Sequence, residues 1–158
     1  MIIDTDVLVW HLRGNETARD IIHNNIPFSI SVVTYIELIQ GMKDKKEMNR
    51  FIKQLSKWDI DIVQISDDIS TRAMIYMEQY HHSNSMELAD ALIAATCTNN
   101  SEELLTANYK HYKFVPNIQI KRFIPQLVDT FELLVYLAGK LGGVRELPLE
   151  ALSLEFAQ

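Results

Sequence analysis

Three acidic residues stand in stretches of sequence that are otherwise apolar. Asp4 lies in the opening MIIDTDVLVW, Glu37 in VVTYIELI and Asp90 in LADALIAA. Acidic side chains are almost never fully buried unless they are paired or bind a metal, so the three placements need a common explanation. We expect the fold to bring the carboxylates together, where repulsion would keep one of them protonated unless a divalent cation is bound.

A cluster of carboxylates is suited to one kind of metal chemistry. Ligand sets made only of oxygen favour Mg²⁺ or Mn²⁺ over zinc. A metal held by Asp4, Glu37 and Asp90 would activate water, orient a phosphate and stabilise the leaving oxygen. The corresponding reaction is in-line hydrolysis of a phosphodiester without a protein nucleophile. No Cys–His or Ser–His–Asp constellation in the sequence competes with it.

Each acid also has a purely structural explanation. Glu37 follows Thr34 by three residues, which fits a capping box, but this explanation fails if the helix already begins at Ser31. Asp6 is explained equally well as the cap of the following turn and as an auxiliary residue of the metal site. Asp90 could pair with a basic residue in the core, although few Lys or Arg residues have apolar neighbours here.

The densest group of basic residues lies on one predicted helix, residues 44–57. It consists of Lys46, Arg50, Lys53 and Lys57, which recur every three or four residues. Such a stripe is more often a solvated helix face than a binding surface. The alternative is that it contacts RNA, since a local basic stripe can hold a polyanion although the formal net charge is −6.

The apolar pattern predicts strands that alternate with helices. The first strand, MIIDTDVLVW, has its polar residues near its end, so Asp4 is expected at the carboxyl end of that strand. Alternation of this kind indicates an α/β fold with a mainly parallel central sheet flanked by helices, in which ligands collect at the carboxyl ends of the strands. Further strands are predicted in PFSISVV, 60–65, 103–108 and 118–123, and helices at 16–25, 31–40, 44–57, 66–82 and 86–100.

Length and composition limit the class of protein. A chain of 158 residues with 47% hydrophobic content suits one compact domain with a short appendage. The single cysteine, Cys97, excludes an intramolecular disulfide. No apolar run approaches the ~20 residues that span a bilayer, and the opening lacks the basic segment of a signal peptide. We therefore expect a cytoplasmic protein without membrane association.

Four blocks of the sequence resemble, in order and spacing, the PIN-domain family and within it the VapC-like toxins. MIIDTDVLVW is similar to the opening strand with its first acid, SISVVTYIELIQGM to the second block with Glu37, and MELADALIAAT to the third with Asp90. LLTANYKHY is similar to the last block, where the family has Asp or Asn; here it is Asn108, a residue that by itself most often marks a turn after a strand. Each block alone is only weakly specific for the family, but four blocks in the same order are a strong indication of it. The resemblance covers about residues 1–124.

This resemblance implies an activity, partners and a site. The activity is that of a Mg²⁺- or Mn²⁺-dependent endoribonuclease, the toxin of a toxin–antitoxin pair, which cuts tRNA or another structured RNA. The partners are a second copy of the chain, in a homodimer, and a small antitoxin that inserts a segment into the acidic cleft. The metal would be held mainly by Asp4 and Asp90, with Glu37 and Asn108 completing the site.

The last part of the sequence, residues 125–158, matches nothing in the family. Pro125 breaks the preceding pattern, and the Leu-rich stretch QLVDTFELLVYLAGKL predicts an amphipathic helix. We therefore expect a nuclease domain over 1–124, followed by a helical extension of unknown role that packs on the domain.

Two other functions fit parts of the sequence. The segment D-T-D-V matches the nucleophile motif of haloacid dehalogenase-like phosphatases, in which Asp4 would be phosphorylated and Asp6 would act as acid and base. That function leaves Glu37 and Asp90 unexplained, and no later G-D-x-x-x-D motif follows. The second alternative is a PIN-type binding module without catalysis, against which the intact set of acids argues.

Overall fold

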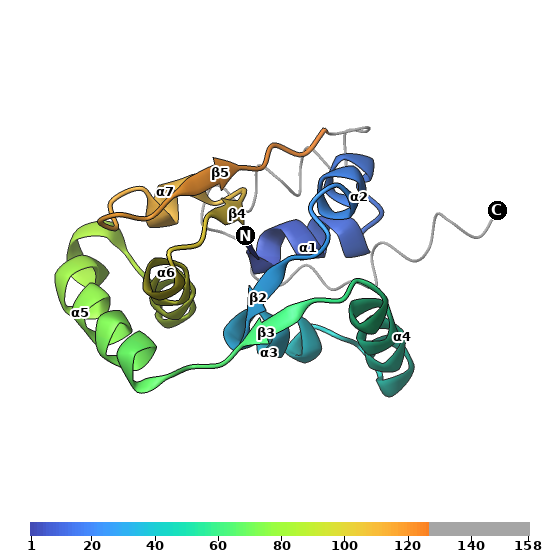
Figure 1. Ribbon diagram of the computed structural model, residues 1–158, viewed down its shortest axis with the longest axis horizontal. Helices are drawn as coiled ribbons and strands as arrows, with labels where there is room; N and C mark the ends of the chain where they lie inside the picture. Colours follow the sequence, from blue (N-terminus) through green and yellow to red (C-terminus); the bar gives the residue numbers. More distant parts are fainter. Residues whose placement is uncertain (127–158) are drawn as a thin grey trace.

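The computed structural model describes residues 1–126, so the helix expected within 125–158 lies outside the described residues. In residues 1–126, seven helices surround one five-stranded sheet (Figure 1). The strands are β1 (Ile2–Ile3), β2 (Ser29–Ser31), β3 (Asp61–Val63), β4 (Leu104–Thr106) and β5 (Ile120–Arg122). The helices are α1 (Thr5–Leu12), α2 (Glu16–His23), α3 (Val32–Gln40), α4 (Lys45–Lys57), α5 (Asp67–Asn84), α6 (Leu88–Asn100) and α7 (Tyr109–Tyr112).

The sheet is parallel throughout, which confirms the predicted α/β class. Its strand order is β3-β2-β1-β4-β5, and Ile2 of β1 lies opposite Ser29 of β2 and Leu104 of β4. The chain therefore builds the sheet outward from β1 in one direction and then returns to the other side of β1 with β4. Ligand sites in such sheets lie outside the carboxyl ends of the strands at the place where the strand order reverses, which here is the pair of neighbouring strands β1 and β4.

The two central strands divide the interior into two cores. Ile3 and Leu105 pack into one core with α1, α2 and α4, whereas Ile2 and Leu104 pack into the other with α5 and α6. Side chains alternate between the faces of a strand, so a sheet covered by helices on both faces needs apolar residues at consecutive positions. This explains the unbroken apolar runs at the start of the chain and at LL of β4.

The predicted first strand is too long. The strand ends at Ile3, and Asp4 has extended backbone and serves as the N-cap of α1, with its Oδ1 accepting from the Thr5 backbone N at 2.8 Å. Asp4 therefore directly follows the strand, at its carboxyl end as expected, whereas Asp6 lies in a helix. The run VLVW belongs to a helix that buries Val7, Leu8 and Trp10, and a short apolar run does not distinguish a buried strand from a buried helix.

Other predicted boundaries agree closely with the structure. Ser31 caps α3, its Oγ accepting from the Val33 backbone N at 3.2 Å, and Gly41 ends the helix. The capping-box explanation of Glu37 is therefore wrong, because the helix begins before Thr34. No helix within residues 1–126 is both long and apolar enough to cross a membrane.

The start of the expected extension contacts the domain. Pro125 is buried, and the Asn15 side-chain amide donates to the carbonyl oxygen of Gln126 at 2.9 Å. The division at residue 124 stays a prediction, because the helix expected beyond it lies outside the part of the chain that the structure describes.

Candidate metal centre at the carboxyl edge of the sheet

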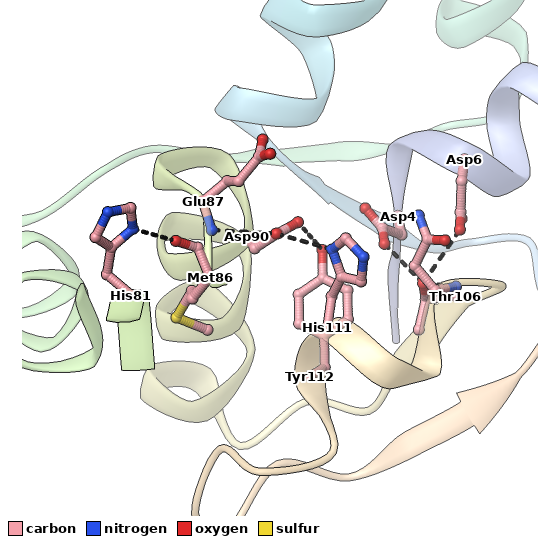
Figure 2. Close-up of polar contacts among 10 residues, drawn as sticks. Asp4, Asp6, His81, Met86, Glu87, Asp90, Thr106, His111 and Tyr112 are labelled. Atoms are coloured by element: carbon pink, nitrogen blue, oxygen red, sulfur yellow. Dashed lines mark hydrogen bonds and ion pairs between the residues drawn. The ribbon is translucent and has the colours of Figure 1, made fainter. Parts of the chain in front are cut away.

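Asp4 lies where β1 and β4 end side by side. Its backbone N donates to the Leu105 carbonyl oxygen at 3.0 Å, and its carboxylate Oδ2 accepts from the Thr106 hydroxyl at 2.7 Å. The residue is only 3% exposed. The parallel pairing of the two strands thus delivers a nearly buried carboxylate to the edge at which the strand order reverses (Figure 2).

Asp6 joins the same group from the first turn of α1. Its Oδ2 accepts from the Ala107 backbone N at 3.0 Å and lies 3.3 Å from the Thr106 hydroxyl oxygen. Its other oxygen, Oδ1, is buried without a hydrogen-bond partner among the described residues. The cap of α1 is Asp4 and not Asp6, so the explanation of Asp6 as a simple turn cap is wrong. Asp6 instead ties α1 to the residue that follows β4.

Asp90 enters the group from the first turn of α6. Its Oδ2 accepts from His111 Nδ1 at 3.0 Å and from the Glu87 backbone N at 3.4 Å, and its Oδ1 accepts from the Tyr112 hydroxyl at 3.4 Å. The side chain is partly buried, and the side chain it contacts is that of a histidine rather than of a core lysine or arginine. Figure 2 shows this side chain directed toward His111 and Tyr112 of α7, beside the Asp4 group.

The acids influence one another electrostatically. Burial, together with the nearby negative charge of Asp90, raises the pKa of Asp4 from 3.8 to about 6, although hydrogen bonds from Thr106 and Thr5 oppose this shift. Burial and the charge of Asp4 raise the pKa of Asp6 well above its ordinary value. Burial is the main cause of both shifts, and the repulsion between neighbouring carboxylates adds to it; a bound cation would relieve that repulsion.

Tyr112 lies between two of the acids. Its hydroxyl interacts with both Asp4 and Asp90. Its pKa is raised well above the ordinary value, first by burial and then by the neighbouring carboxylates, so the phenol remains neutral. Tyr112 therefore supplies a hydrogen bond to the acidic group and adds no charge to it.

The two remaining predicted residues border the group. Glu37 of α3 accepts a hydrogen bond from the Thr5 hydroxyl through Oε2, so it is linked to the residue next to Asp4. Asn108 donates its backbone N to the Thr106 hydroxyl oxygen at 2.9 Å, and it is exposed. Thr106 thus connects the backbone of Asn108 with the carboxylate of Asp4.

The basic stripe lies on a different part of the surface. Lys46, Arg50, Lys53 and Lys57 are all exposed on α4. This helix contacts α1 through the hydrogen bond of 2.8 Å between Gln54 Nε2 and His11 Nε2. At a rise of 1.5 Å per residue, His11 lies about 10 Å along α1 from Asp4. The acids therefore lie at the amino end of α1, whereas α4, which carries the basic stripe, contacts α1 near its carboxyl end.

The donor set fits a metal that keeps much of its water. Within residues 1–126, no three His, Cys, Asp or Glu side chains are arranged to hold a metal by themselves. Hydrogen bonds from Thr106, Ala107 and Thr5 occupy several of the carboxylate oxygens. Mg²⁺ is commonly bound by one or two carboxylates and several waters, rather than by an all-protein cage. Asp4 and Asp90 supply two carboxylates of that kind, and the unpartnered Oδ1 of Asp6 offers a further oxygen.

Sequence reasoning missed three members of this group. Thr106, His111 and Tyr112 all lie in the block LLTANYKHY, in which only Asn108 was singled out. One signal was present in the sequence for Thr106, because it is a polar residue directly after the apolar pair at the start of β4. Nothing in the sequence pointed to His111, since only the fold places α7 beside the first turn of α6.

Comparison with known proteins gives consistent results. Residues 1–115 match the PIN domain family. A curated relative, ribonuclease VapC10 of Mycobacterium tuberculosis, is 32% identical over 131 residues, covering 79% of this chain and 95% of the relative. A solved toxin–antitoxin complex from Klebsiella pneumoniae is similar with a TM-score of 0.63 and 27% identity, covering 74% of this chain and 93% of that chain. VapBC2 from Rickettsia felis, solved with a promoter DNA fragment, shares the fold with a TM-score of 0.65 at 19% identity. The chain belongs to the PIN-domain family.

Proposed function

We propose that this chain is a Mg²⁺- or Mn²⁺-dependent endoribonuclease that acts as the toxin of a toxin–antitoxin pair. The observation that carries the proposal is the meeting of Asp4 and Asp90 at the edge where the strand order reverses. There burial, with a smaller contribution from the charge of Asp90, raises the pKa of Asp4 to about 6. Similarity to a protein named as a ribonuclease supports the activity, and similarity to a toxin–antitoxin complex supports the biological role.

The residues have distinct tasks in this proposal. Asp4 and Asp90 would hold the metal, with Glu37 on one side and the free oxygen of Asp6 on the other. When bound, the metal supplies an acidified water and neutralises the charge that develops on the phosphate. Thr106 fixes the direction of the Asp4 carboxylate by its hydrogen bond of 2.7 Å. Asn108, exposed beside Thr106, would contact the substrate or a bound water.

Glu37 is oriented by its neighbour on α1. The Thr5 hydroxyl occupies Oε2 of Glu37, which leaves Oε1 for a water molecule. A carboxylate in that position can orient an attacking water or take up its proton.

Substrate and partners belong to the same proposal. RNA, such as tRNA or another structured RNA, would be cut in the cytoplasm, and the exposed cations of α4 would contact its backbone outside the acidic edge. The chain would act as a homodimer and be inhibited by a small antitoxin. The solved complex from Klebsiella pneumoniae, which is named as a toxin–antitoxin complex, supports the antitoxin partner.

A non-catalytic PIN-type binding module is the second candidate. It is favoured by the finding that residues 1–126 contain no ready-made group of three metal-binding side chains. The phosphatase alternative loses its support, because the chain belongs to the PIN-domain family. That alternative also left two acids unexplained, and in the structure Asp90 lies near Asp4 while Glu37 contacts Thr5.

One experiment separates the two candidates. The purified full chain, free of antitoxin, is incubated with total cellular RNA in Mg²⁺, Mn²⁺ or EDTA, beside the variants Asp90→Asn and Asp20→Asn. Asp20 is an exposed acid on α2, so its variant is a matched control. We expect discrete fragments that require metal and Asp90 and are unchanged in the control. Equal cleavage in EDTA, or by Asp90→Asn, would contradict the metal mechanism. No cleavage by the folded protein would favour the binding module.

A further inference from the structure

His111 contacts the candidate metal centre, yet the proposed function gives it no role. It lies in the short helix α7, and its Nδ1 is 3.0 Å from Asp90 Oδ2. The side chains of His111 and Asp90 are 33% and 16% exposed. The pair is therefore partly shielded from solvent, unlike the fully exposed ion pairs that contribute little to structure.

The contact also fixes which ring nitrogen carries a hydrogen. An ionised carboxylate only accepts hydrogen bonds, so a bond to Asp90 places the hydrogen on Nδ1. Histidine and carboxylate pairs of this kind are a common way to hold a side chain in one orientation beside a metal. In Figure 2 the His111 ring lies beside the Asp90 carboxylate, on the side of the Asp4 and Thr106 group.

Asp90 has two competing hydrogen-bonding tasks. It is the third residue of α6, and its Oδ2 accepts from the Glu87 backbone N at 3.4 Å as part of a capping box. It also accepts from Tyr112 at 3.4 Å on the side that faces Asp4. Both contacts are long, and the His111 bond of 3.0 Å is the shortest that this carboxylate makes in the described chain. Without His111, only the two long contacts, from the Glu87 backbone N and the Tyr112 hydroxyl, would fix the direction of this carboxylate.

We propose that His111 is a positioning residue, which acts through Asp90 by holding its carboxylate in the direction needed to bind the metal with Asp4. This inference rests on the proposed metal site. Metal ligands must be held within about 0.5 Å of their working geometry. Loss of a residue that orients a ligand typically lowers metal affinity about 10- to 100-fold.

A purely structural role would give a different result. If the contact only attached α7 to α6, removing it would lower the stability of the fold and leave metal affinity unchanged. The nitrogen involved also matters, because positioning requires a donor at Nδ1. Asparagine places its amide nitrogen close to the position of Nδ1, whereas glutamine places its amide nitrogen close to Nε2. These two variants have similar polarity and thus form a matched pair.

The test compares His111→Asn, His111→Gln and His111→Ala in the full chain. The dissociation constant for Mn²⁺ alone is measured from the electron paramagnetic resonance signal of the free ion, and thermal unfolding is measured in EDTA. We expect the Gln and Ala variants to bind Mn²⁺ about 10-fold or more weakly, and the Asn variant to bind within about 3-fold of the original chain. Unfolding in EDTA should be similar for Asn and Gln, so the comparison of these two holds even if Ala does not fold.

Each result has a separate meaning. Unchanged Mn²⁺ affinity in the Gln variant, or equal losses in Asn and Gln, would overturn the positioning role and leave the proposed function standing. Normal Mn²⁺ binding and the expected ranking, without RNA cleavage by the original chain, would support the positioning role and contradict the nuclease. If the original chain does not bind Mn²⁺ saturably, both are overturned.

Discussion

The two edges of the central sheet differ in how their charged groups are arranged: opposite charges pair at one edge, and like charges are neighbours at the other. At the amino edge of β1 and β4, the Met1 ammonium group pairs with the carboxylate of Glu102. At the carboxyl edge of the same two strands, Asp4 is instead buried beside the negative charge of Asp90, and burial together with that charge raises its pKa to about 6. The first arrangement stabilises the fold, whereas the second costs free energy in the absence of a cation. Proteins keep such unfavourable groupings mainly where function requires them.

The largest expected effect is a difference in RNA cleavage between variants at the two edges. Asp4→Asn should lower RNA cleavage by about two to three orders of magnitude, because a metal ligand is lost at the point where charge develops. Glu102→Gln removes one carboxylate at the amino edge and should leave cleavage within about twofold. Initial rates on one labelled RNA in Mn²⁺ measure both. Comparable losses in the two variants would show that the edges do not differ in function.

A second and smaller effect concerns stability in EDTA. The folded-state pKa of Asp4 is raised from 3.8 to about 6, so between these values the folded chain binds more protons than the unfolded chain. Stability from this group is therefore full below pH 3.8, falls as the pH rises, and is lost above about pH 6. Asn is neutral at every pH, so Asp4→Asn should stabilise the metal-free protein at pH 7.5 by on the order of 1–2 kcal/mol, and not at pH 3.5.

The amino edge should give the opposite sign. Glu102→Gln should destabilise the protein at pH 7.5 by about 1 kcal/mol, because a partly buried ion pair is lost. Urea unfolding at both pH values, in EDTA, measures the two variants side by side. If Asp4→Asn were destabilising at pH 7.5, the carboxyl edge would be an ordinary satisfied cluster. Addition of Mn²⁺ should make the original chain more stable to urea than Asp4→Asn, which reverses the order of stability expected in EDTA.

The smallest expected effect tests whether RNA extends to α4. The double variant Lys46→Gln/Arg50→Gln should raise KM for RNA about two- to fivefold at low salt and leave kcat unchanged, since these exposed cations would contact only phosphates. The double variant Arg19→Gln/Arg72→Gln changes the net charge equally on α2 and α5 and serves as the control. Equal changes in KM would show that only the overall charge matters, and that the stripe is a solvated face.

Much of the fold could be predicted from the sequence, because local signals agree with the tertiary structure. The helices predicted to start at residues 31 and 66 do begin there, capped by Ser31 and Ser66, and the apolar runs mark strands that are covered on both faces. The prediction was wrong where an apolar run has two solutions. The segment after Asp4 has the composition of a strand, but it forms α1, because the covered sheet can bury a helix that is apolar on most sides.

The candidate site was predictable only in its acids. An acid among apolar residues, such as Asp4 or Asp90, is unusual enough to be noticed without a structure. The groups that orient those acids are Thr106, His111 and Tyr112, and each is an ordinary residue in its own segment. Their importance comes from contacts with residues that are distant in the sequence. Thr106 lies 102 residues from Asp4, and His111 and Tyr112 lie 21 and 22 residues from Asp90. No local pattern records such contacts.

The span of the Asp4–Thr106 contact has a consequence for the timing of synthesis. Asp4 is made 102 residues before Thr106, whose hydroxyl holds its carboxylate, and Tyr112, whose phenol also holds it, follows later still. At about 5–20 residues per second, a ribosome needs roughly 5–20 seconds to make the intervening chain. A nascent chain therefore cannot assemble the acidic edge until nearly the whole domain has left the ribosome. A nuclease built in this way would not act on the RNA around it during its own translation.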